Sequence, residues 1–391
     1  MKILFLIIAI LLLPIVIKSI WVVCQTYGNG EFAKEKKELI RRVNYLIAKV
    51  ATSPQQVLSA LPAWMGPQFQ GEWAIYTCSM TCKALANIAT LYPEFRETAI
   101  KHIRTIINIV LSDTIRAYDT KRWDEDAFEG LNGNKSHISY YSHVAWMIGE
   151  FKRIGGDDHY DEIYHSLCEA MNRRIANSPI LNLPTYPYES IYIPDMLVAI
   201  VALSDYAKLY NGKYQDTVDA WIGRAKAEWL DKKTGLLASY LSDDGYSLSE
   251  IRGSYSALNC YYLSLIDVPF ANKQYQNLKK HFMQTSPVVG LKEYHDQTCK
   301  FGLDPDAGPI ILNLSSSGTT FAIGCATSLD DNKFRNQLLR TAEIAGTTVT
   351  WGNKSHYLLA NWFLVGEAIA LALRTSSPSV KKTSDDNSNS H

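Results

Sequence analysis

The chain has 391 residues, of which 39 are basic and 39 acidic, so its formal net charge is zero. This length can bury a large core, and the balanced charge gives no reason to expect a nucleic-acid partner. The aromatic residues are skewed towards 23 Tyr and 9 Trp against 12 Phe. Tyr and Trp combine an apolar face with a polar tip, so this bias suits a wet, aromatic-lined cavity.

Residues 3–23 form an apolar run that is broken only by Lys18 and Ser19. About 20 such residues span a bilayer, and Trp21 would lie at the interface. A cleaved signal peptide is the alternative, but no A-x-A arrangement follows the run. The pattern therefore favours an uncleaved membrane anchor over residues 1–24. Basic residues after this segment and an odd number of cysteines, seven, favour a single-pass protein with a cytoplasmic body.

Twelve apolar-periodic segments follow the apolar run, and turn signals such as GGDD, YNGK and DKKTG separate them. The segments are 31–51, 72–91, 94–117, 136–154, 159–176, 194–211, 214–229, 254–266, 270–285, 315–328, 331–345 and 356–374. Residues 236–241 and the region near Trp351 are expected to form minor strands. The last stretch, 375–391, is polar and predicted to be disordered.

Twelve helices would pair as six helix-turn-helix units of roughly 50 to 60 residues, longer than common solenoid repeats. This pattern predicts an all-α fold, an (α/α)6 toroid or six-hairpin barrel, over residues 31–374. An irregular helical domain is the alternative. In such a barrel the loops before the inner helices meet at one open end. Four of these loops are rich in acids and aromatics, namely 123–130, 186–195, 247–256 and 302–311.

Several segments together resemble a known family. They include SHISYYSHVAWMIGEFKRIGGDDHYDEIYHSL, the loop YPYESIYIPD, IRGSYSALNCYYLSLIDVPFA and PDAGPIILNLSSSGTTFAIGCATSLDD. Their content and order are similar to the linalool dehydratase/isomerase family over roughly residues 70–345. The resemblance implies an (α,α)6 barrel and cofactor-independent acid/base chemistry on a small alkenol.

The resemblance also implies site residues. His143 matches the active-site histidine of the family, and Tyr76 and Tyr255 match two of its tyrosines. The two catalytic cysteines of the family fall on Tyr186 and Asp195. Because both thiols are replaced, linalool itself is not expected to be the substrate.

The residues also predict catalytic groups directly. If Glu189 and Asp195 face one cavity, burial and mutual repulsion would raise one pKa and leave an acid beside a base. Alternatively, Asp195 is the N-cap of the helix that follows it. His143 can serve as acid or base, or it can be a buried histidine of the core.

Further side chains are candidates for substrate binding. Arg252 could hold a carboxylate or hydroxyl, or form a surface ion pair, and Asp306 could face the cavity or brace a turn. The remaining candidates are Tyr186, Tyr192, Trp123 and Asp126. The pairs Cys78/Cys82 and His295/Cys299 have helical spacing but lack further ligands, so no metal is expected, and the resemblance to the family implies no cofactor.

The sequence thus favours a membrane-anchored lyase or isomerase that hydrates, dehydrates or moves a proton on a small hydroxylated or lipid-like molecule. Homo-oligomerisation is left open. A carbohydrate-active barrel enzyme (a glycosidase, lyase or epimerase) is the first alternative, because paired acids with Trp and Tyr suit sugar rings. A non-catalytic binding toroid tethered at the membrane is the second.

Overall fold

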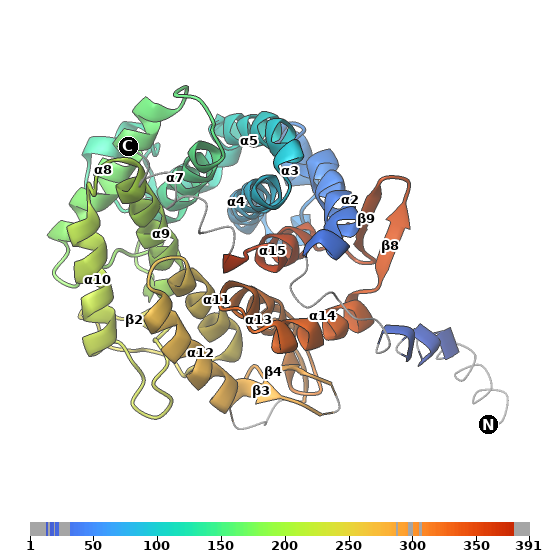
Figure 1. Ribbon diagram of the computed structural model, residues 1–391. Helices are drawn as coiled ribbons and strands as arrows, with labels where there is room; N and C mark the ends of the chain where they lie inside the picture. Colours follow the sequence, from blue (N-terminus) through green and yellow to red (C-terminus); the bar gives the residue numbers. More distant parts are fainter. Residues whose placement is uncertain are drawn as a thin grey trace.

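The computed structural model describes residues 13–14, 16–18, 20–22, 32–286, 288–295, 300–304 and 307–378. In this part of the chain, helices form two concentric rings around one axis (Figure 1). The inner helices are α4 (Pro67–Leu91), α7 (Ile138–Arg153), α9 (Ile193–Leu209), α11 (Gly253–Ser264), α13 (Ser316–Ser328) and α15 (Leu364–Arg374). Each packs on the next, and α15 packs on α4, so the inner ring is closed.

The outer ring covers the inner one with helices that run between its members. Its helices are α2 (Phe32–Val50), α5 (Arg96–Val110), α8 (Asp161–Asn177), α10 (Gln215–Glu228), α12 (Val268–Phe282) and α14 (Asn332–Gly346). Two further helices, α3 (Pro54–Ser59) and α6 (Asp113–Trp123), lie beside α4. The predicted helical class is confirmed, and the paired rings are the arrangement expected of an (α/α)6 toroid.

Burial patterns explain which helices are inner and which are outer. Every residue of α11 is buried, and α9 is buried along nearly its whole length, as expected for helices that are enclosed on all sides. The outer helix α2 instead buries one stripe, which contains Leu39, Val43 and Leu46. Caps fix some of the helix starts, since the side chain of Asp267 accepts from Phe270 N and that of Asp331 from Phe334 N.

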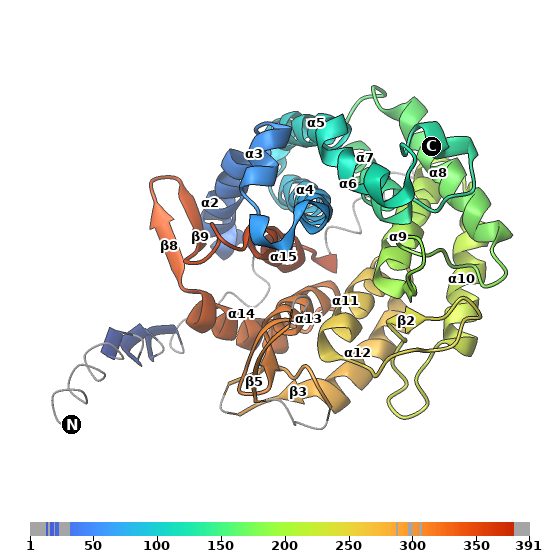
Figure 2. The ribbon, with the colours of Figure 1, turned by 180° about the vertical axis from the view of Figure 1, so that it is seen from behind.

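Short antiparallel strand pairs lie in the connections that lead to inner helices (Figure 2). They are β1 (Ile191–Tyr192) with β2 (Tyr240–Leu241), β3 (Met283–Gln284) with β4 (Gly290–Leu291), β5 (Phe301–Asp304) with β6 (Gly308–Ile311) and β7 (Leu314–Ser315), and β8 (Thr348–Trp351) with β9 (Lys354–Tyr357). The strands expected in 236–241 and near Trp351 are confirmed as β2 and β8. The residues of β9 were predicted to be helical and are not, because they pair with β8.

No helix in the described ranges has the length and apolar character needed to cross a membrane. This finding overturns the expected single-pass membrane protein with its cytoplasmic body, and the membrane as a partner. Residues 1–12, 15, 19, 23 and 24 of the predicted anchor lie outside the described residues.

The chain after α15 fills the end of the barrel opposite to the short strands. Thr375, Ser376 and Ser377 are buried. Asn87 of α4 donates to the Thr375 hydroxyl at 3.3 Å, and the Ser328 hydroxyl donates to the Ser376 carbonyl at 3.0 Å. The predicted disordered tail therefore begins with ordered residues, while 379–391 lie outside the described residues.

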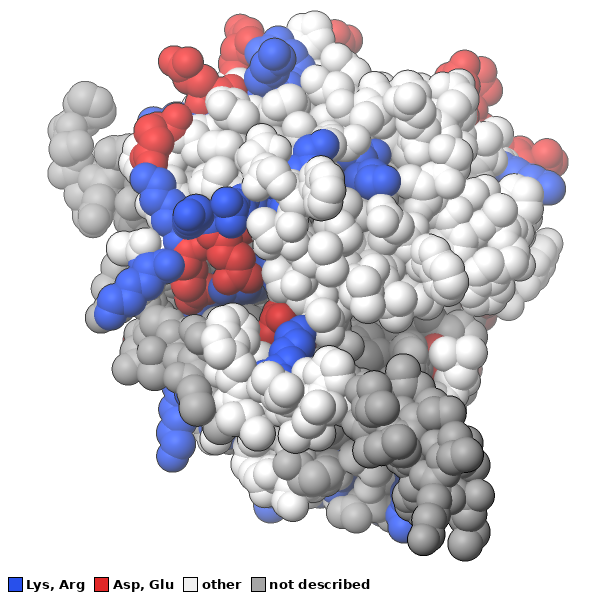
Figure 3. Space-filling view, turned by 90° about the vertical axis from the view of Figure 1, so that its right-hand side faces the viewer, with Lys and Arg blue, Asp and Glu red and all other residues white. Residues whose placement is uncertain are grey.

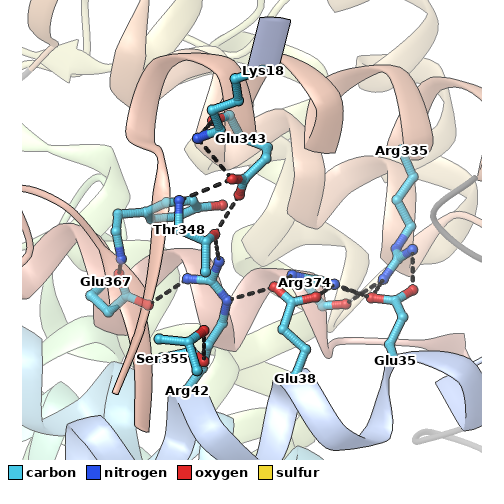
Figure 4. A network of polar contacts seen from close by, with 12 residues as sticks. Lys18, Glu35, Glu38, Arg42, Arg335, Glu343, Thr348, Ser355, Glu367 and Arg374 are labelled. Carbon is cyan, nitrogen blue, oxygen red and sulfur yellow. Dashed lines mark hydrogen bonds and ion pairs between the residues drawn. The ribbon is translucent and has the colours of Figure 1, made fainter. Parts of the chain in front are cut away.

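A largely buried series of alternating charges joins the first outer helix to the last helices (Figure 4). Arg335 and Arg374 bind Glu35 at 2.8 and 2.6 Å, and Arg374 also binds Glu38 at 2.9 Å. Arg42 then bridges Glu38 and Glu367 at 2.9 and 2.7 Å.

The pKa values of the acidic residues in this series follow from their ion pairs. Burial alone would raise the pKa of Glu35 and Glu38, but the neighbouring guanidinium groups outweigh it and hold both values below the usual range. Figure 3 shows charged side chains of both signs at the left, the top and the right edge of this side of the molecule, while its middle is mostly uncharged. Six charged residues form this series of ion pairs, and we call them the closing network: Glu35, Glu38, Arg42, Arg335, Glu367 and Arg374.

Candidate active site

Asp195 lies in the first turn of α9, at the end of the barrel where the inner helices begin (Figure 2). Its side chain is buried, and its Oδ2 accepts a 2.9 Å hydrogen bond from the Thr185 hydroxyl. Its Oδ1 accepts no hydrogen bond from any described residue. The N-cap of α9 is Tyr192, so Asp195 is not the cap that the alternative interpretation required. One carboxylate oxygen is therefore held and the other is left for a ligand.

Glu72 is a second carboxyl group, which the sequence analysis did not select. It lies in the second turn of α4 and has no ion pair within the described ranges. Burial raises its pKa to about 8, and repulsion from Asp195 adds to this rise. The charge of Arg122 and the hydroxyl of Tyr186 act in the opposite direction.

The two carboxyl groups differ in their protonation at neutral pH. Burial raises the pKa of Asp195 to about 6, with a further rise from Glu189 and an opposing effect of the Thr185 bond. Asp195 is then mainly ionised at pH 7, while Glu72 keeps its proton. A protonated and an ionised carboxyl group at the same end of the barrel can serve as an acid and a base.

Hydroxyl groups surround Glu72. The hydroxyls of Tyr118 and Tyr186 are buried and lie near Ser139 and Glu72, but they meet no partner at hydrogen-bond geometry. Gly71 allows α6 to approach this closely, because a Cβ at that position would lie 2.5 Å from the Cβ of Tyr118. The unsatisfied hydroxyls give the site spare hydrogen-bonding capacity for a polar ligand.

His143 and Tyr76 lie together deeper in the barrel. Their rings are 5.1 Å apart, and the Tyr76 hydroxyl is 3.0 Å from that of Tyr262. Burial lowers the pKa of His143 to about 3, so its ring is neutral at pH 7. The Ser79 hydroxyl donates to the Tyr76 carbonyl and lies 2.8 Å from Nδ1 of His143. When the single Ser79 proton lies on this bond to the carbonyl, Nδ1 of His143 is the protonated nitrogen and Nε2 is an acceptor.

Glu189 lies at the rim of the site rather than within it. Its side chain is half exposed and pairs with Arg122 at 2.9 Å. The guanidinium of Arg122 stacks 4.1 Å from the ring of Tyr186, which is buried. Glu189 acts on the site through its charge, which raises the pKa of both Glu72 and Asp195.

A tyrosine cluster borders Asp195 on the side of β1 and β2. The ring of Tyr192 lies 4.9 Å from that of Tyr240 and 5.7 Å from that of Tyr255. Arg252 stacks 4.7 Å from Tyr255, and its guanidinium binds Glu293 and Asp304 at 2.6 and 2.9 Å. Two carboxylates thus balance the charge of Arg252, which positions the loops before α11 and α13.

Two of the remaining candidates, Asp126 and Trp123, brace a loop. Asp126 binds Arg116 at 2.7 Å and accepts from Phe128 N, and these contacts, against the effect of burial, lower its pKa. Trp123 packs 5.4 Å from the ring of His137, which in turn binds the buried Asp119 at 2.6 Å. Asp306 lies outside the described residues.

One sequence pattern could have identified Glu72 as a site residue. In EWAIY, Glu72 and Tyr76 are four residues apart, so a helix places both side chains on one face. The predicted helix began at residue 72, whereas α4 begins at Pro67. Because α4 begins five residues earlier than predicted, Glu72 lies in its second turn and not at its end.

Several solved structures share this fold. An unsaturated glucuronyl hydrolase specific for heparin aligns with a TM-score of 0.55 at 10% identity, over 91% of this chain and 99% of its own. A glycosyl hydrolase family 88 protein from Bacteroides vulgatus gives 0.52 at 8%, over 88% and 98%. A polysaccharide lyase gives 0.51 at 12%, over 88% and 97%. What these chains share at such identities is the fold. No protein-family model and no curated protein matches the sequence.

These findings correct the sequence analysis. The expected membership of the linalool dehydratase/isomerase family is wrong, because no family model matches and the similar folds belong to carbohydrate-active enzymes. The predicted lyase or isomerase acting on a small hydroxylated or lipid-like molecule is overturned with it. His143, Tyr76 and Tyr255 stay candidates on their geometry alone.

The raised pKa of Glu72 predicts a pH-dependent gain in stability for Glu72→Gln. The folded value of about 8 lies above the ordinary value of 4.5, so between these values the folded chain holds a proton that the unfolded chain has lost. The free energy of unfolding therefore falls as the pH rises through this window, by about 1.4 kcal/mol for each pH unit. Urea unfolding should show similar stability of wild type and variant near about pH 5 and a more stable variant, by a few kcal/mol, near about pH 9. A constant difference across this range would contradict the raised pKa.

Proposed function

We propose that the protein is a carbohydrate-active enzyme that cleaves a glycosidic bond, with Glu72 as the general acid and Asp195 as the base. The observation that carries this proposal is that the buried Asp195 and the partly buried Glu72 lie at one end of the barrel with pKa values of about 6 and about 8. Carboxyl pairs with separated pKa values are the usual machinery of glycoside hydrolysis.

The proposed reaction is a hydrolysis. Glu72 gives its proton to the glycosidic oxygen as the bond from this oxygen to the anomeric carbon breaks. Asp195 removes a proton from the water that attacks this carbon, or it attacks the carbon itself and water then releases the sugar. The free Oδ1 of Asp195 suits either role, since Thr185 holds the other oxygen. Tyr76 and Nε2 of His143 can bind sugar hydroxyls.

The open end of the barrel supports a sugar substrate. The segments before α4, α9, α11 and α15 each expose an aromatic side chain, namely Trp64, Tyr188, Tyr246 and Trp362. Aromatic faces pack against the apolar faces of sugar rings, while their polar tips stay in water. The similar folds named above belong to a hydrolase specific for heparin, a glycosyl hydrolase and a polysaccharide lyase, which favours the same substrate class.

The pH profile tests the assignment of the two groups. After a panel of polysaccharides has identified a substrate, kcat/KM should rise as Asp195 ionises near about 6 and fall as Glu72 loses its proton near about 8. Glu189→Gln should move both limbs to lower pH, because the negative charge of Glu189 raises both values. A profile that stays flat from about pH 5 to about pH 9 would contradict this pair.

Product analysis tests the reaction. Hydrolysis in isotopically labelled water should place one labelled oxygen in the product, and the anomeric configuration tells which role Asp195 plays. An unlabelled product with a new carbon–carbon double bond would instead identify an eliminating lyase and overturn the proposed hydrolysis.

A further inference from the structure

A polar groove of about 520 Å³ lies at the same end of the barrel as the carboxyl pair. Its walls are α2, α3 and the segment that enters α15. The side-chain amide of Gln70, in the first turn of α4, donates to the carbonyls of Leu58 and Leu61 at 2.8 and 3.2 Å. This contact fixes the wall formed by α3 to the helix that carries Glu72. The groove has a volume within the roughly 300–1,000 Å³ of known ligand sites.

The groove carries polar groups with spare bonding capacity. Tyr45 donates to Oδ1 of Asn361 at 2.9 Å, and burial raises the pKa of Tyr45 to about 12, so the hydroxyl keeps its proton. The amide nitrogen of Asn361 and the side-chain amide of Gln56 then make no hydrogen bond to any described residue. Amides and hydroxyls in this arrangement are the groups that bind sugar hydroxyls.

Lys49 gives the groove its charge. Its ammonium group lies 5.9 Å from the ring centre of Tyr45 and has no carboxylate partner in the part of the chain described. No acidic side chain lines the groove in the described ranges. A groove with one uncompensated cation among neutral hydrogen-bonding groups is complementary to a sugar that carries a carboxylate or sulfate.

Two exposed tryptophans lie close in the sequence to residues that line the groove. Trp362 follows the groove residue Asn361 directly, and Trp64 lies in the short turn between α3 and α4. Both side chains are more than two thirds exposed, at 72% and 79%. Such surface indoles offer stacking faces for sugar rings.

We propose that this groove is a distal subsite that binds an acidic sugar unit of a polysaccharide whose cleaved bond lies at Glu72 and Asp195. The proposal rests on the proposed function and extends it, because it assigns the substrate to acidic polymers longer than a disaccharide. Lys49 pairs with the acidic group, and Gln56 and Asn361 bind ring hydroxyls.

Binding to an inactive chain tests the subsite apart from catalysis. In a Glu72→Gln background, titration calorimetry would compare hexasaccharides of polygalacturonate, alginate and heparin with uncharged cellohexaose and with acidic disaccharides. Lys49→Gln should weaken the binding of the preferred acidic hexasaccharide about tenfold, as expected for one charge-assisted contact. Lys37→Gln is the matched control, because Lys37 is exposed on the same helix and does not line the groove.

The outcomes separate the two proposals. If Lys49→Gln leaves hexasaccharide affinity unchanged, or weakens cellohexaose and disaccharides equally, the acidic subsite is wrong even when the wild type cleaves glycans. If Lys49 governs binding of acidic hexasaccharides but the wild type cleaves none of the panel, the subsite stands and the proposed hydrolysis fails.

Discussion

Glu72→Gln should lower kcat/KM on the cleaved glycan by about 10²- to 10⁴-fold, the usual contribution of a general acid. The amide cannot donate a proton to the leaving oxygen, while its shape keeps the packing against α6. The measurement is initial rate at about pH 7, where the wild-type group carries its proton. A glycan with a good leaving group should recover most of the rate, because its departure does not need an acid.

Three further variants make this result specific. Asp195→Asn should cause a loss of similar size, and the double variant should lose little more, because groups that act as one unit are not additive. Glu97→Gln, on the exposed face of α5, should leave the rate unchanged. Near-normal activity of folded Glu72→Gln would exclude Glu72 as the acid.

Arg374→Met should destabilise the fold by about 3–5 kcal/mol, the range found when one partner of a buried ion pair is removed. Arg374 binds both Glu35 and Glu38 of the closing network, and it is buried. Its loss leaves buried carboxylates with too few cations. Urea unfolding near neutral pH would measure the change.

A surface pair provides the control for this variant. Lys36 of α2 pairs with Glu94, and both side chains are about half exposed, so Lys36→Met should cost less than about 1 kcal/mol. The lowered pKa values of Glu35 and Glu38 add a pH signature. Their stabilisation is present above the ordinary value of 4.5 and is lost as the pH falls, so the gap between wild type and Arg374→Met should narrow in acid. Equal losses for both variants would contradict the role of the network.

Local periodicity was enough to predict the helices. The predicted segments 194–211 and 331–345 differ from α9 and α14 by no more than two residues at either end, because burial on one or all sides leaves a clear pattern. The exceptions are 72–91, which begins five residues after the start of α4, 94–117, which covers α5 and only the first part of α6, and 356–374, whose first part pairs as β9. Strand pairing there depends on β8, and a helical pattern in one segment does not reveal it.

The site was only half predictable. Asp195 was selected because its loop concentrates acids and tyrosines before a helix. Glu72 was not, since α4 and α9 are not neighbours in the ring, with α7 between them. Whether side chains of such helices meet depends on how each helix is rotated about its own axis within the barrel. No local pattern carries that information, so the sequence does not reveal that the charge of Asp195 acts on Glu72.

The closing network also has a consequence for how the chain is made. Glu35 and Arg374 are separated by 339 positions, so α2 leaves the ribosome long before its partners exist. Until then its carboxylates stay solvated, and the inner ring lacks the helix that joins α13 to α4. Barrel closure therefore belongs to the last stage of folding, after synthesis of α15. A chain that stalls before residue 374 would have an inner ring that is open between α13 and α4. Chaperones and proteases recognise such incompletely folded chains.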